Sequence, residues 1–407
     1  MSERIYDVVI WGASGFTGRL VVEYMYRVYG RSGDVRWAVA GRNEQKLQQV
    51  LRDTGCSSNI PIVIADSSDE TSLRNLAEQT KVVCTTVGPY AKYGSLLVKF
   101  CAETGTHYTD LTGEVHWMRR MIDQHHVEAQ NSGARIVHSC GFDSIPSDLG
   151  VLLLQRAMFE KHGVYSPNVK YRVVKASGGV SGGTIDSAVN MMEESKSDPS
   201  ILPLMADPYA LNPLNMPRGE DKKDKTSVFY DKDFEQWTTP FVMAGVNTRV
   251  VRRSHSLLGY PWGNNFRYDE AVLVGDGPGG IVKAWFITAV TGLLIALTAF
   301  SFTRKLFARL APSPGEGPSP EAIRKGFFNI ELFASHPDEP ECSMVAAVTG
   351  DRDPGYGATS KMIAESAVCL AKDELDTPTG VLTPAVAMGQ RLIDRLQRNA
   401  GVYFTLK

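Results

Sequence analysis

The chain has 407 residues, of which 43% are hydrophobic and 22% charged, so it is long enough for two domains and is not a disordered protein. Its 43 Lys and Arg residues balance 45 Asp and Glu residues, which leaves no basic excess for a nucleic-acid partner. The six cysteines form no short pair, so the sequence contains neither a zinc-binding spacing nor a disulfide framework, as is typical of a reducing compartment. The N-terminus shows no signal-sequence pattern, and we expect a cytoplasmic protein.

Strand and helix patterns alternate along the N-terminal part of the chain. The apolar run at 6–11 is followed by a helical pattern at 17–29, and further strand patterns, each followed by a helix, lie at 36–40, 61–65, 82–87, 107–111 and 135–139. Continuous β-branched runs bounded by glycine are typical of parallel strands that are buried on both faces. The sequence therefore predicts an α/β fold with a Rossmann-type doubly wound parallel sheet in residues 1–154.

The remainder of the chain does not continue this alternation of strand and helix patterns. Strand patterns lie at 168–175, 226–230, 271–274, 327–332 and 342–349, and the charged stretch 218–235 is predicted to be a solvated, mobile loop. We expect a second α+β domain at 155–350, for substrate binding or dimerisation. Helical patterns at 360–372 and 384–398 predict a C-terminal portion, 351–407, that packs back on the first domain.

A glycine-rich loop of sequence GASGFTG directly follows the first strand and opens the first helix. The first glycine permits a tight turn, the second lets a pyrophosphate approach the backbone, and the third lets the helix pack closely on the sheet. The helix N-terminus supplies N–H donors for the phosphates. The loop predicts dinucleotide binding by its seven residues, Gly12, Ala13, Ser14, Gly15, Phe16, Thr17 and Gly18.

The end of the second strand predicts which dinucleotide is bound. An NAD site usually carries an acid there to bind the ribose 2′-OH, but this chain has Arg42, which suits the 2′-phosphate of NADP. The alternative is that Arg42 is a surface residue that caps the next helix. Asp66, after the third strand, is expected near the adenine ring, and Gly88 and Pro89, after the fourth, beside the nicotinamide ribose.

Several motifs together resemble one family. The stretches GASGFTGR (12–19), AGRNEQKL (40–47), SCGFDSIPSDLG (139–150) and GVLTPAVAMG (380–389) are similar to the saccharopine dehydrogenase-like oxidoreductases, and more narrowly to their trans-acting enoyl reductase branch. The resemblance covers nearly the whole chain. It implies a Rossmann domain, a second α+β domain, NADP-dependent reduction and a lipid or polyketide-like substrate.

Two residues are candidates for catalysis. Tyr90 follows the loop expected nearest the nicotinamide and could donate a proton or orient the substrate, and the alternative is an aromatic residue that only packs. Asp143 precedes Pro146 and is interpreted first as part of a helix start and second as a catalytic acid. The YxxxK motif from Tyr171 to Lys175 is rejected as a catalytic pair, because its period-2 pattern predicts a strand.

The segment 284–302 contains no charge and is bordered by Lys283 and by Arg304, Lys305 and Arg309. As a helix it would be roughly 28 Å long, about the thickness of a bilayer core. A full crossing conflicts with C-terminal helices that return to the first domain, so we expect monotopic membrane association at the periphery of the plasma membrane. The alternative is a helical hairpin buried in the second domain or at a homodimer interface.

The sequence predicts an NADP(H)-dependent oxidoreductase that reduces an enoyl or carbonyl group of a lipid-like substrate at a membrane surface, with no metal. One alternative is a non-catalytic NADP-binding scaffold on a membrane or lipid droplet. The other is a saccharopine-type amino-acid reductase, which would need a cationic clamp for a carboxylate; Arg249, Arg252 and Arg253 could form one, although basic residues in a loop are more often solvated.

Overall fold

The computed structural model describes residues 4–30, 33–56, 59–178, 182–299 and 317–407. The chain divides into two compact units. The first unit contains Met1–Ile145, Pro314–Gly317 and Gly355–Gly401, and the second contains Pro146–Ser313, Pro318–Pro354 and Val402–Lys407. The division therefore falls at the start of helix α7 (Ile145–His162), earlier than the domain end expected at 154, and the last strand belongs to the second unit.

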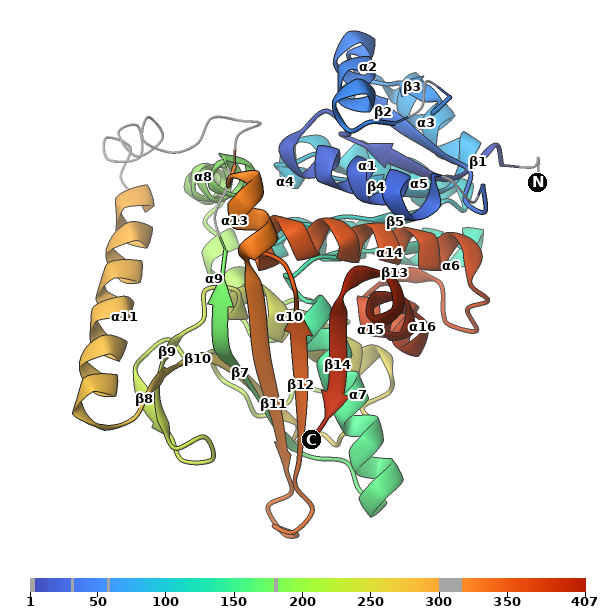
Figure 1. The fold of residues 1–407 in the computed structure, drawn as a ribbon. Helices are drawn as coiled ribbons and strands as arrows, with labels where there is room; N and C mark the ends of the chain where they lie inside the picture. The colour runs from blue at the N-terminus through green and yellow to red at the C-terminus, as the bar shows by residue number, and fades with distance from the viewer. Residues whose placement is uncertain (1–3, 31–32, 57–58, 179–181, 300–316) are drawn as a thin grey trace. The chain divides into compact units, whose positions relative to one another are not determined.

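The first unit is built on a seven-stranded sheet of order β13-β6-β5-β4-β1-β2-β3, in which every pair is parallel (Figure 1). This confirms the predicted α/β class. The strand order reverses between β1 and β4, which is where ligands bind in such sheets. The strands are β1 (Tyr6–Trp11), β2 (Trp37–Gly41), β3 (Ile62–Ile64), β4 (Thr80–Thr85), β5 (His107–Thr109), β6 (Arg135–Val137) and β13 (Gly380–Leu382).

The helices of the first unit follow the predicted pattern closely. Right-handed crossovers in a sheet of this order place helices on both faces. Helices α1 and α14 pack against each other, whereas α5 packs between α3 and α6. Their bounds are α1 (Phe16–Tyr29), α2 (Glu44–Asp53), α3 (Glu70–Gln79), α4 (Tyr90–Tyr93), α5 (Ser95–Thr104), α6 (Val115–Ser132), α14 (Thr359–Lys372), α15 (Pro384–Ala387) and α16 (Gly389–Arg395), with π-helical turns η1 (Pro354–Ala358) and η2 (Leu396–Ala400).

The C-terminal helices α14 and α16 are bound to helix α1 through the fully buried Glu365 of α14. Its carboxylate accepts hydrogen bonds from the hydroxyls of Tyr24 and Tyr29 on α1, at 2.7 and 2.6 Å. Arg395 of α16 approaches the same carboxylate at 3.4 Å. Three side chains from two other helices thus converge on one buried acid, which satisfies its charge.

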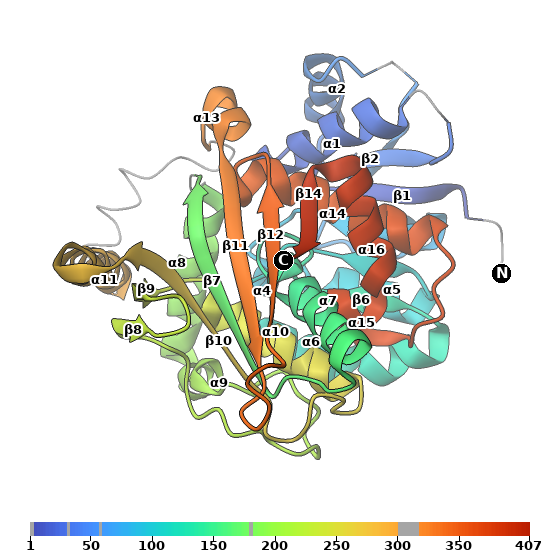
Figure 2. The same cartoon turned by 60° about the horizontal axis from the view of Figure 1, so that its bottom comes forward.

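The second unit is built on a mixed sheet of order β14-β12-β11-β7-β10-β9-β8, in which only β7 and β10 pair in parallel (Figure 2). Helices α7 and α10 (Ala244–Leu257) lie on the same face, joined by a hydrogen bond from Ser254 to Asp148. The other elements are β7 (Asn168–Ser177), α8 (Gly182–Ser197), α9 (Ile201–Ala206), β8 (Phe229–Asp231), β9 (Gln236–Pro240), β10 (Arg267–Gly275), α11 (Gly277–Ala299), α13 (Pro320–Lys325), β11 (Phe327–Ser335), β12 (Met344–Gly350) and β14 (Val402–Leu406).

Strand β7 confirms the rejection of the YxxxK motif. Tyr171 and Lys175 both lie in this strand, with Tyr171 fully buried and Lys175 exposed, so the two side chains do not share a helical face.

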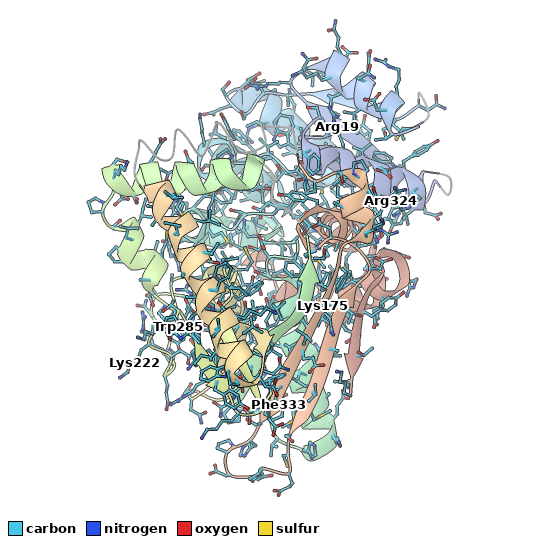
Figure 3. The ribbon with its side chains drawn as sticks, turned by 60° about the vertical axis from the view of Figure 1, so that its left-hand side comes forward. Arg19, Lys175, Lys222, Trp285, Arg324 and Phe333 are labelled. Atoms are coloured by element: carbon cyan, nitrogen blue, oxygen red, sulfur yellow. The ribbon has the colours of Figure 1, made fainter. Side chains whose placement is uncertain are left out.

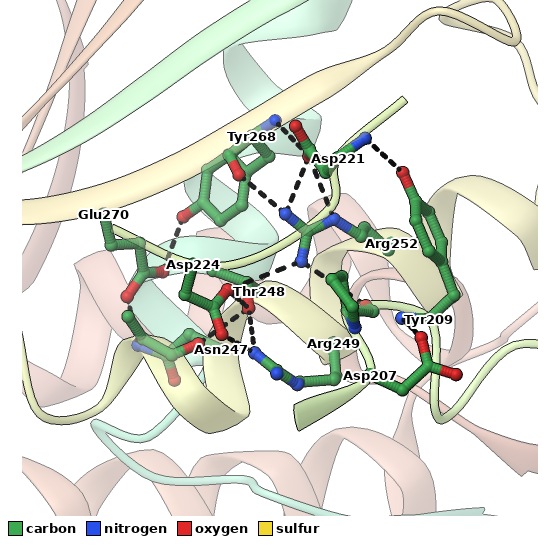
Figure 4. A network of polar contacts seen from close by, with 12 residues as sticks. Asp207, Tyr209, Asp221, Asp224, Asn247, Thr248, Arg249, Arg252, Tyr268 and Glu270 are labelled. Carbon is green, nitrogen blue, oxygen red and sulfur yellow. Dashed lines mark hydrogen bonds and ion pairs between the residues drawn. The ribbon is translucent and has the colours of Figure 1, made fainter. Parts of the chain in front are cut away.

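The charged segment 218–235 is largely exposed, as its composition predicts, but two of its acids are fixed to a helix. Arg249 and Arg252 lie on the buried helix α10, and they bind Asp224 and Asp221 of this segment (Figure 4). The side chain of Arg253 donates to the carbonyl oxygen of Leu211. Because a buried guanidinium needs a partner, these ion pairs fix the segment against α10.

Helix α11 is long, apolar and exposed. It runs without interruption through the described part of the segment 284–302, whose last three residues lie outside the described residues. Within the described residues this segment is therefore one exposed helix that is not buried in the second unit, and burial at a homodimer interface stays a prediction. Within them, this helix is long and apolar enough to cross a membrane by length and composition, although helices of soluble proteins pass the same test.

Candidate cofactor and catalytic site

The glycine loop lies at the carboxyl end of β1, at the switch point of the first sheet. Gly12 has φ +87, a conformation that suits glycine, and its carbonyl oxygen accepts a hydrogen bond from Gly15 N at 2.9 Å. A Cβ on Gly18 would lie 2.2 Å from the carbonyl oxygen of Gly12, so only glycine lets α1 start this close to the turn. Local sequence thus produces the turn and the close helix packing that dinucleotide-binding loops need.

The N-terminus of α1 is open to an anion. Gly15 is the N-cap and provides no side-chain acceptor, and the first turn contains no acid. The first N–H groups of the helix therefore have neither a side-chain cap nor a nearby negative charge, which suits a pyrophosphate.

Arg42 and Asp66 follow β2 and β3 at the same edge of the sheet. Asn43, not Arg42, caps α2, because its side chain accepts from Lys46 N at 3.0 Å. Arg42 is exposed and makes no hydrogen bond or ion pair within the part of the chain that the structure describes. Hydrogen bonds from Ser68 and the positive charge of Arg42 lower the pKa of Asp66. The arginine is thus available to a phosphate, whereas the aspartate is held by its own loop.

The loop after β4 rests directly on the glycine turn. Thr86 N donates to Trp11 O at 3.0 Å, and a Cβ on Gly12 would lie 2.5 Å from the side chain of Val87. The Gly88–Pro89 peptide bond is cis, and Gly88 is exposed. The structure therefore brings this loop and the glycine loop together, as expected for the two sides of a dinucleotide site.

Tyr90 is a buried support for this loop rather than a free proton donor. Its hydroxyl donates to Thr85 O at 3.3 Å and accepts from Leu111 N at 3.2 Å. Its ring stacks on Trp117 with centroids 5.6 Å apart. Burial raises the pKa of Tyr90 well above its ordinary value. These contacts match the packing alternative considered from the sequence, and a catalytic role of Tyr90 stays a prediction.

Two buried acids, Glu114 and Asp110, join the loops after β4, β5 and β6. The Glu114 carboxylate accepts from the backbone N–H groups of Tyr90 and Ala91, at 2.9 and 2.8 Å. One oxygen of Asp110 accepts from Ser139 N at 3.0 Å, and the other lies 2.7 Å from His138 Nδ1. Both acids can be recognised in the sequence because they lie at the carboxyl end of a predicted strand. Their hydrogen-bond partners cannot be predicted from the sequence.

Asp143 lies in the loop between β6 and α7. Pro146 is the second residue of α7, which agrees with the predicted helix start. The loop is conformationally unusual, because Ser139 and Ser144 have φ +59 and +94. Asp143 is half-buried and has no hydrogen-bond partner among the described residues, and desolvation raises the pKa of its carboxyl group to about 7. A carboxyl group with this pKa can hold a proton near neutral pH and release it.

The other described groups are weaker candidates for a metal or substrate site. Among the described residues, no cluster of three or more His, Cys, Asp or Glu side chains could hold a metal ion. A surface pocket of about 520 Å³ in the second unit includes Arg218 and Arg267 in its lining. These arginines are paired with Asp207 and Glu220, so neither presents an unmatched charge to a ligand.

The fold and the glycine loop define an NADP-dependent oxidoreductase of the Rossmann type, and residues 8–137 match the saccharopine dehydrogenase NADP binding domain. The chain belongs to the trans-acting enoyl reductase family. It is 35% identical to the trans-acting enoyl reductase of Mycobacterium leprae, covering 98% of this chain and 97% of that one, and 36% identical to that of Mycobacterium bovis, with the same coverage. A Mycobacterium tuberculosis member of this group is 38% identical over 97% of this chain and 96% of its own.

The solved structure of apo saccharopine dehydrogenase (L-Glu forming) from Saccharomyces cerevisiae shares the fold. The match has a TM-score of 0.53 and covers 99% of both chains at 13% identity. The resemblance stated from the motifs and the predicted NADP cofactor are thus confirmed.

Arg42→Ala tests cofactor selection. The guanidinium is expected to bind the 2′-phosphate through charge-assisted hydrogen bonds worth about 1.5–3 kcal/mol, so the Kd for NADPH should rise about tenfold or more. The weaker binding of NADH should not change, because NADH lacks that phosphate. Calorimetric titration measures both, with Arg52→Ala on α2 as the control. Wild-type protein that binds both cofactors equally would contradict this role of Arg42.

Proposed function

We propose that this protein is a cytoplasmic enoyl or carbonyl reductase that uses NADPH on a lipid-like substrate at a membrane surface. The observation that carries the proposal is Asp143, an unpaired carboxyl group with a raised pKa on the cofactor-binding unit. It is supported by the 35–38% identity to trans-acting enoyl reductases over nearly the whole chain.

Different residues of the first unit would bind the cofactor and transfer the proton. The N-terminus of α1 would hold the pyrophosphate and Arg42 the 2′-phosphate, while the loop 86–89 would flank the nicotinamide end. When bound, NADPH would supply the hydride for the β-carbon of an enoyl substrate. The electron pair of the double bond moves toward the carbonyl oxygen, and Asp143 then donates the proton that completes the reduction at the α-carbon.

Glu114 and Asp110 would act as positioning residues. Glu114 fixes the loop that begins with Tyr90, and Asp110 fixes the start of the loop that carries Asp143. Because proton transfer requires a donor within hydrogen-bond distance of the acceptor, restraint of these loops supports the chemistry.

An amino-acid reductase is less well supported. Arg249 and Arg252 are engaged by carboxylates of the chain itself, and Arg253 by a backbone carbonyl, so none of the three presents a free clamp to a substrate carboxylate. A non-catalytic scaffold would bind NADPH in the same way and differs only in turnover.

The test is an assay of purified protein with NADPH and a medium-chain 2-enoyl thioester. We expect loss of NADPH absorbance and formation of the saturated thioester, identified by mass spectrometry, with little reaction when NADH replaces NADPH. NADPH binding without turnover of enoyl or ketone substrates would favour the scaffold. Turnover only with an amino acid and an oxo acid would favour the saccharopine-type reaction.

A further inference from the structure

The exposed face of α11 is a continuous apolar stripe. Phe286 is 69% exposed and Leu293 is 60% exposed, far more than is usual for large apolar side chains of a folded unit. Figure 3 shows Trp285 on the outer side of this helix. The stripe recurs every three or four residues, as a single helical face does, and consists of Val282, Trp285, Phe286, Val290, Leu293 and Leu294.

The opposite face of α11 is bound to the second unit. Ala284 is fully buried, and Thr288 Oγ1 lies 2.7 Å from Thr239 Oγ1 of β9. Gly280 lets the helix approach β9 closely, because a Cβ there would lie 3.1 Å from the ring of Trp237. The helix is therefore held along its side by its own unit, and only one face is open to a partner.

The chemistry of the open face favours lipid over a protein partner. The six side chains of the stripe carry no charge and, apart from the indole of Trp285, no hydrogen-bonding group that could fix the register of a protein partner, and the exposed Lys283 lies beside them. In the sequence, cations border the apolar stretch at both ends, at Lys283 and at Arg304 and Lys305. Cations flanking an apolar face, with an aromatic ring near one end, are the pattern that suits an anionic bilayer surface.

The packing also indicates how the helix would meet the bilayer. With 23 residues α11 is long enough to span a hydrocarbon core. Spanning the bilayer would separate its inner face from β9 and break the contact between Thr288 and Thr239. We infer that α11 lies in the plane of an anionic membrane, with the stripe from Val282 to Leu294 among the headgroups and outer acyl chains. This inference deepens the proposed function by naming its membrane surface, and it rests on the membrane part of that proposal.

The test is flotation of the full chain with preformed vesicles of phosphatidylcholine and phosphatidylglycerol. Wild-type protein should float with these vesicles, bind less to phosphatidylcholine alone and be released at high salt. Phe286→Glu should lower partitioning by about a hundredfold, because it removes a ring that the bilayer would bury and adds a charge that an anionic surface repels. Val127→Glu, on α6, is the control, since Val127 is 66% exposed and the substitution is identical.

NADPH binding and thioester reduction, measured on the same preparations, separate this inference from the proposed function. Flotation without reduction would support the membrane surface and contradict the enzyme assignment. Folded wild-type protein that binds NADPH but does not float would overturn the inference, as would Phe286→Glu protein that floats like wild type. A vesicle-free dimer that Phe286→Glu converts to monomer would assign the stripe to a second copy of the chain instead.

Discussion

Asp143→Asn should lower kcat for enoyl reduction by about 10²–10⁴-fold, the usual contribution of a positioned general acid. The amide is close to the carboxyl group in size, but it cannot transfer a proton at neutral pH. Because Asp143 has no hydrogen-bond partner among the described residues, the substitution breaks no interaction of the fold there, and the Kd for NADPH should be unchanged.

The pH profile gives a second, independent measure. The protonated form of Asp143 is the donor, and its pKa is about 7, so the wild-type rate should fall above that pH. This decline should be absent in the residual activity of Asp143→Asn. If the variant keeps both the wild-type rate and the wild-type decline, another group donates the proton.

Tyr90→Phe is the matched comparison. It removes a hydroxyl that bonds Thr85 O and Leu111 N, so it should lower stability by about 1 kcal/mol and leave kcat within a few-fold of wild type. The two catalytic candidates of the sequence are thereby distinguished. A loss of activity in Tyr90→Phe as large as in Asp143→Asn would restore the tyrosine as the donor.

The first unit was largely predictable because its signals are local. Strands β1 and β2 are short, largely apolar runs that end at glycine, and GASGFTG lies where the first strand meets the first helix. Strand β13 was not predicted, since Gly380–Leu382 becomes a strand only by pairing with β6, which lies far away in the sequence. Hence long-range pairing, not local preference, defines the edge of the sheet.

The second unit was less predictable because its buried charges are defined by tertiary contacts. A cluster of basic residues in the sequence usually indicates solvent exposure, yet Arg249 and Arg252 are buried on α10. Their partners Asp221 and Asp224 lie in a segment whose composition predicts a mobile loop. The burial of the arginines cannot be predicted without knowing their aspartate partners, and the fixed position of the aspartates cannot be predicted without the arginines.

The same limit applies to the site. Strand ends indicated that Tyr90 and Asp143 lie at the ligand-binding edge, and NADP followed from the glycine loop and Arg42. The sequence could not show that the hydroxyl of Tyr90 is engaged whereas the carboxyl group of Asp143 has no partner among the described residues. That difference depends on hydrogen bonds between loops from separate strands.

Glu270→Gln should stabilise the second unit at alkaline pH. Glu270 is buried on β10, where it accepts hydrogen bonds from Tyr268 Oη at 2.7 Å and Asn247 Nδ2 at 3.0 Å. Burial raises its pKa to about 8 from an ordinary 4.5, although these two hydrogen bonds oppose the shift. The folded state therefore holds a proton that the unfolded chain has released.

The sign of the pH dependence follows from that difference. Below about pH 4.5 both states are protonated, and the contribution of Glu270 to stability is fully present. As pH rises toward 8 the unfolded state ionises freely while the folded state does not, so the free energy of unfolding falls, by at most about 5 kcal/mol. Glutamine cannot ionise, and its variant should not lose this stability.

Urea unfolding of both proteins at a series of pH values between 5 and 8 measures the effect. The free energies of unfolding should be similar at the acid end, and the advantage of Glu270→Gln should grow steadily toward the alkaline end. Glu220→Gln, which changes a half-exposed acid of the same unit, should show no such growth. A constant difference between wild type and Glu270→Gln across this range would mean that Glu270 ionises with an ordinary pKa in the folded protein, because only a shifted pKa makes the difference depend on pH.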